Sequence, residues 1–194
     1  MAHGPFDLRA EIYRDVFNKA PNFSSYVATG TPQQQERWNS MYGSLTLSDT
    51  QRGECSSWTR TLNLLVMSGV WCGDCIRQCP MIARIAEAAP AITLRFIDNN
   101  QHAELRDQLR IAGGARVPVL IALSEDFFEI GRFGDRTLSH YRAKAKRELG
   151  VACDAGLYHD HDELSRELSE WLEVIERFHL MVRLSPFLRE RHGD

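Results

Sequence analysis

An apolar run at residues 62–68 that leads directly into two cysteines constrains the fold more than any other feature of the sequence. A mostly apolar run of this length predicts a strand that is buried on both faces of a sheet. After Cys72 and Cys75, apolar residues recur at helical spacing as far as Ala89, and Pro80 is expected to kink this helix. The cysteine pair is therefore expected between a buried strand and the start of a helix.

The residues that follow alternate between strand and helix patterns. β-Branched and alternating runs predict strands at 92–98, 117–123 and 127–133, and the last two are close enough to form a hairpin. Helical patterns lie between them at 102–111 and after them at 137–149. This order predicts an α/β protein with a mixed central sheet, parallel first and antiparallel at one edge, and with helices on both faces.

The two ends of the chain differ from this middle part. Residues 1–60 carry three helical patterns, with a loop at 21–32, and no motif with an evident chemical role. After residue 150 a loop precedes a long helix with an apolar stripe. We therefore expect a helical N-terminal extension over 1–60, a core over 61–150, and a C-terminal helical extension over 151–194 that packs on the core.

Composition and charge exclude several classes of protein. The 194 residues include 23 basic and 26 acidic side chains, and this net charge of −3 makes nucleic acid a poor partner. No run of about 18 apolar residues is present, so no membrane span is expected. The first twenty residues lack the uninterrupted apolar stretch of a secretory signal, which leads us to expect a cytoplasmic protein.

The cysteines form a local cluster rather than a disulfide framework. Their number is odd, and three of the five lie within eight residues. That distribution favours a reactive or metal-binding site over the stapled core of a small secreted domain. The five are Cys55, Cys72, Cys75, Cys79 and Cys153. We interpret Cys55 and Cys153 as inert thiols.

The C-x-x-C pair carries the chemistry that the sequence predicts best. A sulfur at the start of a helix lies among unpaired backbone N–H groups, which favour the thiolate over the thiol. Cys75 lies about one turn further along, within bonding reach of Cys72. This arrangement predicts a two-step exchange in which Cys72 attacks a substrate disulfide and Cys75 resolves the mixed disulfide.

These residues resemble the thioredoxin family. The sequence WCGDC at residues 71–75 is similar to the WCGPC active site of that family, and Pro80 matches its helix-kinking proline. Val117 and Pro118 precede a strand where the family has its cis-proline. Gly134 matches a glycine beside the substrate groove, and the likeness covers about residues 60–150.

The resemblance implies a role for each matched residue. Cys72 and Cys75 would be catalytic, as the redox-active centre. The groove and its tuning would depend on their neighbours: Trp71 and Pro118 as shaping residues, Gly73 as the residue that permits the turn, Asp74 as a modulator of the thiols, and Val117 and Gly134 beside them.

The same resemblance implies a protein-disulfide oxidoreductase. Its substrates would be protein disulfides, and electrons would come from an upstream reductase or a small thiol. No bound organic cofactor and no metal are implied, because the Cys72–Cys75 disulfide itself accepts and donates the electrons. Neither nucleic acid nor a membrane is expected as a partner.

Two departures from the family pattern bear on the mechanism. The buried aspartate of the family falls near Val66, so the deprotonation of Cys75 needs water, Asp74 or another group. Asp74 replaces the usual proline. Its carboxylate should raise the pKa of the nearby thiols, yet its position at a helix N-terminus favours negative charge. The sequence alone does not decide between these two effects.

Several alternatives remain open at this level. Cys79 shares a helix face with Cys75, so it is either a second resolving thiol or a small buried residue. The domain is alternatively a redox-inactive binding module. A third hypothesis is a metal protein that uses Cys72, Cys75 and Cys79, although metal sites of this kind normally need four ligands. The run of His and Asp at 159–162 is interpreted as the start of the last helix.

Overall fold

A four-stranded mixed sheet forms the centre of the computed structural model, which describes residues 7–150 and 163–193. The order across the sheet is β2-β1-β3-β4. β1 pairs in parallel with β2, and the β1–β3 and β3–β4 pairs are antiparallel. The predicted sheet is therefore confirmed. Its strands are β1 (Leu62–Ser68), β2 (Ile92–Asp98), β3 (Val119–Leu123) and β4 (Glu129–Gly134).

The strand that precedes the cysteines is central and fully buried. All seven residues of β1 are buried, as the apolar run predicted. Its parallel register with β2 runs from Leu62 opposite Ile92 to Ser68 opposite Asp98. The carboxyl end of β1, and with it the loop that carries the cysteines, is thereby fixed by neighbours on both sides.

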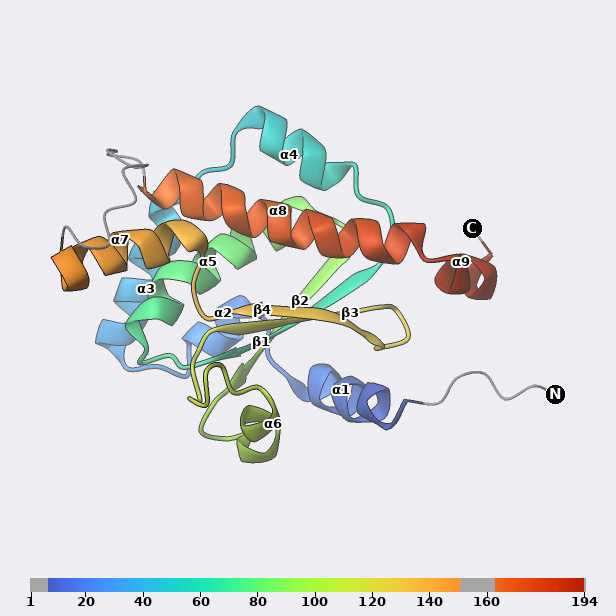
Figure 1. Cartoon of the computed structure of the whole chain (residues 1–194), viewed down its shortest axis with the longest axis horizontal. Helices are drawn as coiled ribbons and strands as arrows, with labels where there is room; N and C mark the ends of the chain where they lie inside the picture. The colour runs from blue at the N-terminus through green and yellow to red at the C-terminus, as the bar shows by residue number, and fades with distance from the viewer. Residues whose placement is uncertain (1–6, 151–162, 194) are drawn as a thin grey trace.

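Helices cover both faces of this sheet (Figure 1). α5 (Gly73–Ala88) and α8 (Glu163–Leu184) lie on one side, and α1 (Leu8–Lys19) and α6 (Ala103–Gln108) lie on the other. α5 keeps its helical form through Pro80. The fold is therefore of the α/β thioredoxin-like class, with an additional long helix near the C-terminus.

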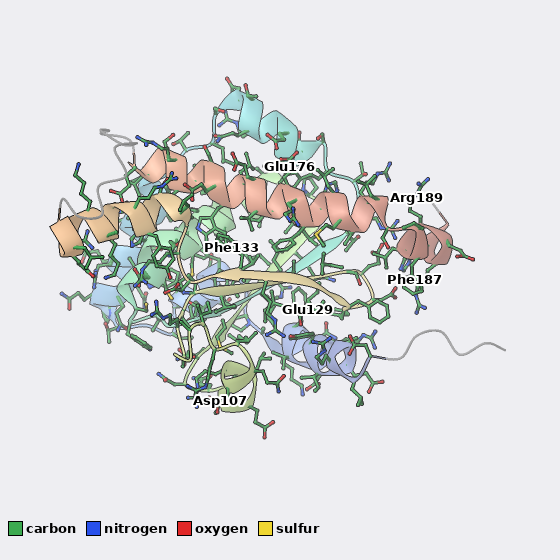
Figure 2. The ribbon with its side chains drawn as sticks, viewed as in Figure 1. Asp107, Glu129, Phe133, Glu176, Phe187 and Arg189 are labelled. Atoms are coloured by element: carbon green, nitrogen blue, oxygen red, sulfur yellow. The ribbon has the colours of Figure 1, made fainter. Side chains whose placement is uncertain are left out.

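The close packing of α8 on the sheet depends on a glycine and an aromatic pair. A Cβ on Gly131 of β4 would lie 2.6 Å from a ring carbon of Phe178, so only glycine leaves room for that ring. Phe133 of the same strand meets Trp171 edge-on, with ring centroids 5.0 Å apart, and Figure 2 shows Phe133 below α8. Trp171 is fully buried, which makes α8 part of the core.

The N-terminal helices begin at well-formed caps. The side chains of Asn22, Thr31 and Ser48 accept hydrogen bonds from backbone N–H groups in the first turn of the helix that each precedes. Such caps satisfy donors that a helix start otherwise leaves without partners. The three helices are α2 (Phe23–Val27), α3 (Pro32–Ser44) and α4 (Asp49–Ser56).

Two short helices were not predicted from the sequence. α2 falls inside the expected loop at 21–32, where five residues are too few to show a helical period. α9 (Pro186–His192) follows α8, and Ser185 caps it. The predicted helix at 137–149 is confirmed as α7 (Leu138–Leu149), which Thr137 caps.

The predicted division into three parts stays a prediction, although the core that joins these parts is continuous. One hydrophobic cluster includes Trp38 from the N-terminal helices, Val66 from the sheet and Trp171 from α8. Cys153 and the run at 159–162 lie outside the described residues. None of the described helices has both the length and the apolar character that crossing a bilayer requires.

Candidate active site

The start of α5 positions Cys72. Cys72 is the N-cap residue of α5, and its backbone N–H donates to the carbonyl of Gly69, 2.9 Å away. The indole Nε1 of the buried Trp38 donates to the carbonyl of Val70 at 2.8 Å. Through this hydrogen bond, the N-terminal helix α3 fixes the loop between β1 and the cysteines.

The two sulfurs differ in accessibility. Cys72 is partly exposed, whereas Cys75 is completely buried one turn further along α5. The thiol of Cys72 donates to the carbonyl oxygen of Val117 across a gap of 3.8 Å. The peptide bond between Val117 and Pro118 is cis, as the resemblance implied. The sulfur of Cys72 is therefore accessible beside the cis-proline, whereas that of Cys75 is not.

The two glycines of the predicted site have different roles. A Cβ on Gly134 would lie 2.5 Å from the carbonyl oxygen of Pro118, so glycine is required where β4 passes the cis-proline. A Cβ on Gly73 would meet no atom within 4 Å, and the backbone there is not left-handed. Other side chains would therefore fit at Gly73, and its role as the residue that permits the turn stays a prediction.

Neither thiol is ionised as easily as the helix start predicted. The thiol of Cys75 and partial burial raise the pKa of Cys72, and they outweigh the backbone N–H groups of Asp74 and Cys75, which lower it. Burial also raises the pKa of Cys75 well above its ordinary value. The pKa of Cys72 is thus shifted in the direction opposite to the one that the helix start predicted, and its thiol donates to the carbonyl of Val117.

The carboxylate of Asp74 is held by cations. Arg136 binds both of its oxygens, with Nε 3.1 Å from Oδ1. His140 Nε2 lies 3.4 Å from the same Oδ1. Partial burial would raise the pKa of Asp74, but the hydrogen bonds from His140 and Arg136 lower it to about 2. The negative charge that replaces the family's proline is thus neutralised by its neighbours.

His140 connects the cysteine loop to α8. Its Nδ1 lies 3.3 Å from Oε1 of Glu167, a fully buried carboxylate that Arg77 also binds through Nε and Nη2. Both ring nitrogens of His140 thus face a carboxylate. Hydrogen bonds to Asp74 and then Glu167 raise the pKa of His140 to about 9, so the ring is an imidazolium at neutral pH.

Asp135 is a second buried carboxylate near Cys72. Asp135 is 2% exposed; it pairs with Arg136 at 2.8 Å and with Arg116 at 3.3 Å, and it accepts from the hydroxyl of Tyr141. A cleft of about 400 Å³ lies beside Cys72, and Asp135 forms part of its lining. Its lining residues are Trp71, Cys72, Asp74, Ala115, Arg116, Val117, Asp135, Arg136 and Lys144.

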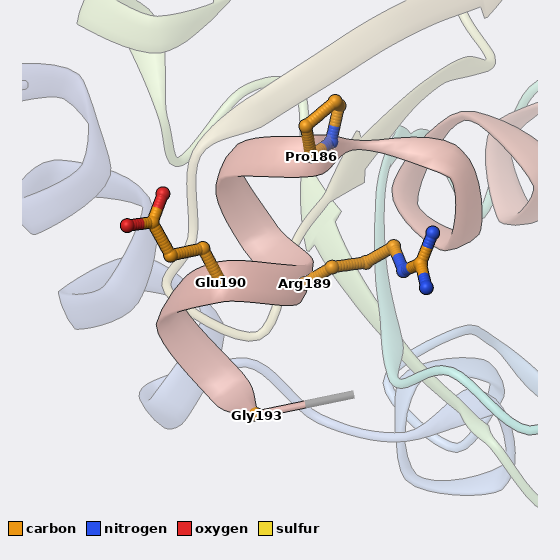
Figure 3. Close-up of a pocket in the computed structure, with 4 residues that line it drawn as sticks. All are labelled: Pro186, Arg189, Glu190 and Gly193. Carbon is orange, nitrogen blue, oxygen red and sulfur yellow. The ribbon is translucent and has the colours of Figure 1, made fainter.

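The structure brings four of the predicted site residues together at this cleft. Trp71, Cys72, Asp74 and Val117 line it, and half of the Trp71 side chain is exposed, as expected of a groove wall. A second hollow lies on α9, at the end of the molecule opposite α7 (Figures 1 and 3). It is lined by Pro186, Arg189, Glu190 and Gly193, none of which is a thiol.

Cys79 is the third cysteine of the cluster and lies about one turn after Cys75 on α5. Cys79 is fully buried, and its sulfur lies 3.5 Å from the hydroxyl of Ser68. Side chains four apart on a helix have Cβ atoms about 5–6 Å apart, whereas a disulfide needs about 3.5–4.5 Å. A bond between Cys75 and Cys79 would therefore require α5 to deform, and this disfavours Cys79 as a second resolving thiol.

Metal binding is disfavoured by the arrangement of the described residues. Among them, the one group of potential ligands near enough to share an ion consists of His140, Glu163 and Glu167, and not of the three cysteines. Arg77 already pairs with both of these glutamates. Its cationic guanidinium takes the place that a metal ion would occupy.

Sequence reasoning missed the residues that act on the cysteines from distant parts of the chain. Trp38, His140 and Glu167 lie on α3, α7 and α8, and Arg136 lies between β4 and α7. No spacing rule connects them to the motif. The one available signal was Asp74, because a carboxylate in place of proline implies a cationic partner, although Arg77 three residues later is the cation that its local sequence offers.

The comparisons with known proteins identify the family. The model of the thioredoxin family matches residues 20–143, which is more than half of the chain. The chain therefore belongs to the thioredoxin family. The match begins near the end of α1, so it includes α2, α3 and α4 as well as the sheet. A search of curated proteins found no match.

Two solved structures share the fold. A crystal structure of a protein of unknown function from Pseudomonas aeruginosa is 24% identical, with a TM-score of 0.67, over 85% of this chain and 97% of that one. An HIV epitope-scaffold is 19% identical, with a TM-score of 0.62, over 89% of this chain and 98% of that one. At such identities the likeness concerns the fold alone.

The imidazolium of His140 predicts a pH dependence of stability. Because folding raises the pKa of His140 from 6.5 to about 9, its contribution is complete below pH 6.5 and is lost as the pH rises through 9. Between these values we expect the free energy of unfolding to fall by about 3 kcal/mol more in the native protein than in His140→Gln. Urea titrations at several pH values measure this difference, and parallel curves would contradict the assignment.

Proposed function

We propose that this protein is a thiol–disulfide oxidoreductase that reduces protein disulfides through Cys72 and Cys75. One observation carries the proposal: a partly exposed sulfur at the start of a helix lies beside a cis-proline, and a buried second sulfur lies one turn behind it. Membership of the thioredoxin family supports the same chemistry.

In the first step Cys72 gives its proton to solvent and its sulfur attacks one sulfur of a substrate disulfide. The substrate S–S bond breaks, and the released sulfur leaves as a thiolate that takes up a proton. The carbonyl of Val117, which accepts a hydrogen bond from the thiol of Cys72 in the free dithiol, lies at the site of attack. The product of this step is a mixed disulfide on Cys72.

In the second step the sulfur of Cys75 loses its proton and attacks Cys72. The bond between Cys72 and the substrate breaks, and the substrate sulfur leaves with the electron pair. The protein now carries a Cys72–Cys75 disulfide, and the substrate has gained two electrons and two protons. A reductase or a small thiol in the cytoplasm returns the pair to the dithiol.

The proton affinity of the two thiols favours the reducing direction. Oxidants of this family owe their strength to a stabilised thiolate, which stabilises the reduced form. Here the pKa of Cys72 is raised, first by Cys75 and then by burial, and the pKa of Cys75 is raised by burial. The dithiol therefore lacks that stabilisation and gives up its electrons more readily.

A redox-inactive binding module is the alternative function. Its supporting observation is the same raised pKa of Cys72, since a protonated sulfur is a slow nucleophile. The two functions differ in what happens to a bound disulfide. A binding module leaves its partner oxidised, and its affinity does not depend on the sulfur of Cys72.

A trapping experiment tests the proposed function. We expect Cys75→Ser to accumulate a mixed disulfide with intact insulin, whose chains are joined by disulfides, because its Cys72 attacks but cannot be released. Cys72→Ser, the matched control, should capture nothing. Non-reducing gels and mass spectrometry measure the adduct. Equal absence of adduct from both variants would favour the binding module.

The raised pKa of Cys72 predicts how its reactivity changes with pH. While the pH is below the pKa, the thiolate fraction grows about tenfold per pH unit. We expect the alkylation rate of Cys72 in the reduced native protein, in which Cys75 is buried, to rise without a plateau between pH 6 and 8 when it is measured with iodoacetamide. A plateau below pH 7 would show a stabilised thiolate and would contradict the assigned reducing direction.

A further inference from the structure

The cleft beside Cys72 is lined by charged side chains of both signs. The bonds that form and break in disulfide exchange join sulfur atoms, so these charges bear on the other parts of a substrate. The cations of the lining are Arg116, Arg136 and Lys144, and its carboxylates are Asp74 and Asp135.

The two carboxylates are withdrawn from solvent and already held by a cation. Asp135 is buried, and Asp74 is partly buried. Arg136 binds both of them, with Nη1 2.8 Å from Oδ2 of Asp135 and Nε 3.1 Å from Oδ1 of Asp74. A substrate that enters the cleft therefore meets little uncompensated negative charge.

Arg116 presents the most accessible positive charge of the cleft. Its side chain is 43% exposed, and its contact with Asp135 joins Nη1 to Oδ2 at 3.3 Å. A guanidinium has five N–H donors, so this contact leaves others available. Lys144 is less exposed, at 33%, and its Nζ lies 2.6 Å from a carboxylate oxygen of Glu148.

A tight turn of the backbone holds Arg116 close to the nucleophile. The backbone groups of Ile111 and Gly114 exchange two hydrogen bonds, at 2.9 and 3.0 Å, and the N–H of Arg116 donates to the carbonyl of Gly114 at 2.9 Å. The next residue is Val117, whose carbonyl accepts from the thiol of Cys72. Arg116 is thus adjacent in the chain to the group that contacts the attacking sulfur.

The size of the cleft limits which part of a substrate can reach Arg116. A volume of about 400 Å³ corresponds to roughly 7 Å in each direction, a length that an extended chain covers in about two residues. When a substrate cysteine meets Cys72, its neighbours one or two positions away therefore lie at the lining of the cleft.

We propose that the cleft selects peptide disulfides that carry a carboxylate side chain one or two residues from the attacked cysteine, and that Arg116 binds this carboxylate. The inference rests on the proposed exchange reaction and names its substrate class. The planar fork of a guanidinium matches the two oxygens of a carboxylate, whereas a basic neighbour of the cysteine would be repelled. Arg116 is then a specificity-determining residue.

Three synthetic peptides test this selection. They differ only in the residues on either side of a single cysteine, which are both Asp, both Asn or both Lys. The cysteine is joined to thionitrobenzoate, the better leaving group, so attack by Cys72 on the peptide sulfur releases the coloured thiolate. Dividing each second-order rate by the rate with mercaptoethanol, a neutral thiol, removes differences in the intrinsic reactivity of the peptides.

We expect the native protein to prefer the Asp peptide over the Asn peptide by about threefold to fivefold, the strength of a partly exposed ion pair. The Lys peptide should react more slowly than either, and added salt should reduce the preference for Asp. Arg116→Gln should abolish that preference. Lys19→Gln, the matched control, should keep it, because Lys19 pairs with Asp15 on α1, outside the lining of the cleft.

The outcomes separate this inference from the proposed function. If no peptide releases thionitrobenzoate, the exchange reaction fails, and the inference fails with it. Equal normalised rates for the Asp and Asn peptides would leave the exchange standing and overturn the inference. A preference that persists in Arg116→Gln, or that Lys19→Gln loses equally, would also overturn it.

Two further measurements apply if Arg116→Gln fails to fold. Arg116→Lys keeps the charge without the fork, so it should keep part of the preference for the Asp peptide. In the native protein, a preference that does not change between low and high salt would contradict an ion pair with Arg116.

Discussion

The contact between Cys72 and the cis segment at Val117 is the constraint on which the rest of the structure depends. It requires that the carboxyl end of β1 and the start of β3 lie side by side. The antiparallel pairing of these two strands places them there. The contact also requires glycine at Gly134, where a Cβ would lie 2.5 Å from the carbonyl oxygen of Pro118. The sheet therefore serves chiefly to bring a sulfur and a carbonyl group together.

The helices added at both ends of the sheet act on the same few atoms. α3 holds the cysteine loop through Trp38, and α8 reaches Asp74 through Glu167 and His140. Asp74 can replace the family's proline because Arg136 and His140 neutralise its charge. These extensions are thus better understood as supports of the active site than as separate interaction modules.

The sequence predicted well those features that depend on neighbouring residues. The bounds of β1 followed from seven residues without a polar face, and the cysteine pair followed from its spacing. The sequence did not predict outcomes that depend on distant residues or on burial in the folded protein. The net effect of Asp74 depends on Arg136, which lies 62 positions away. The sign of the pKa shift at Cys72 depends on Cys75 and on burial, which a rule about helix starts leaves out.

The reduction potential of the Cys72–Cys75 pair tests the central claim most directly, because it measures how far the protein stabilises its reduced form. Equilibration with glutathione and with a dithiol of known potential gives this value. Since neither thiolate is stabilised, the account predicts a potential near that of reducing thioredoxins, about −270 mV. A potential near −120 mV, as in strong oxidants of this fold, would contradict it.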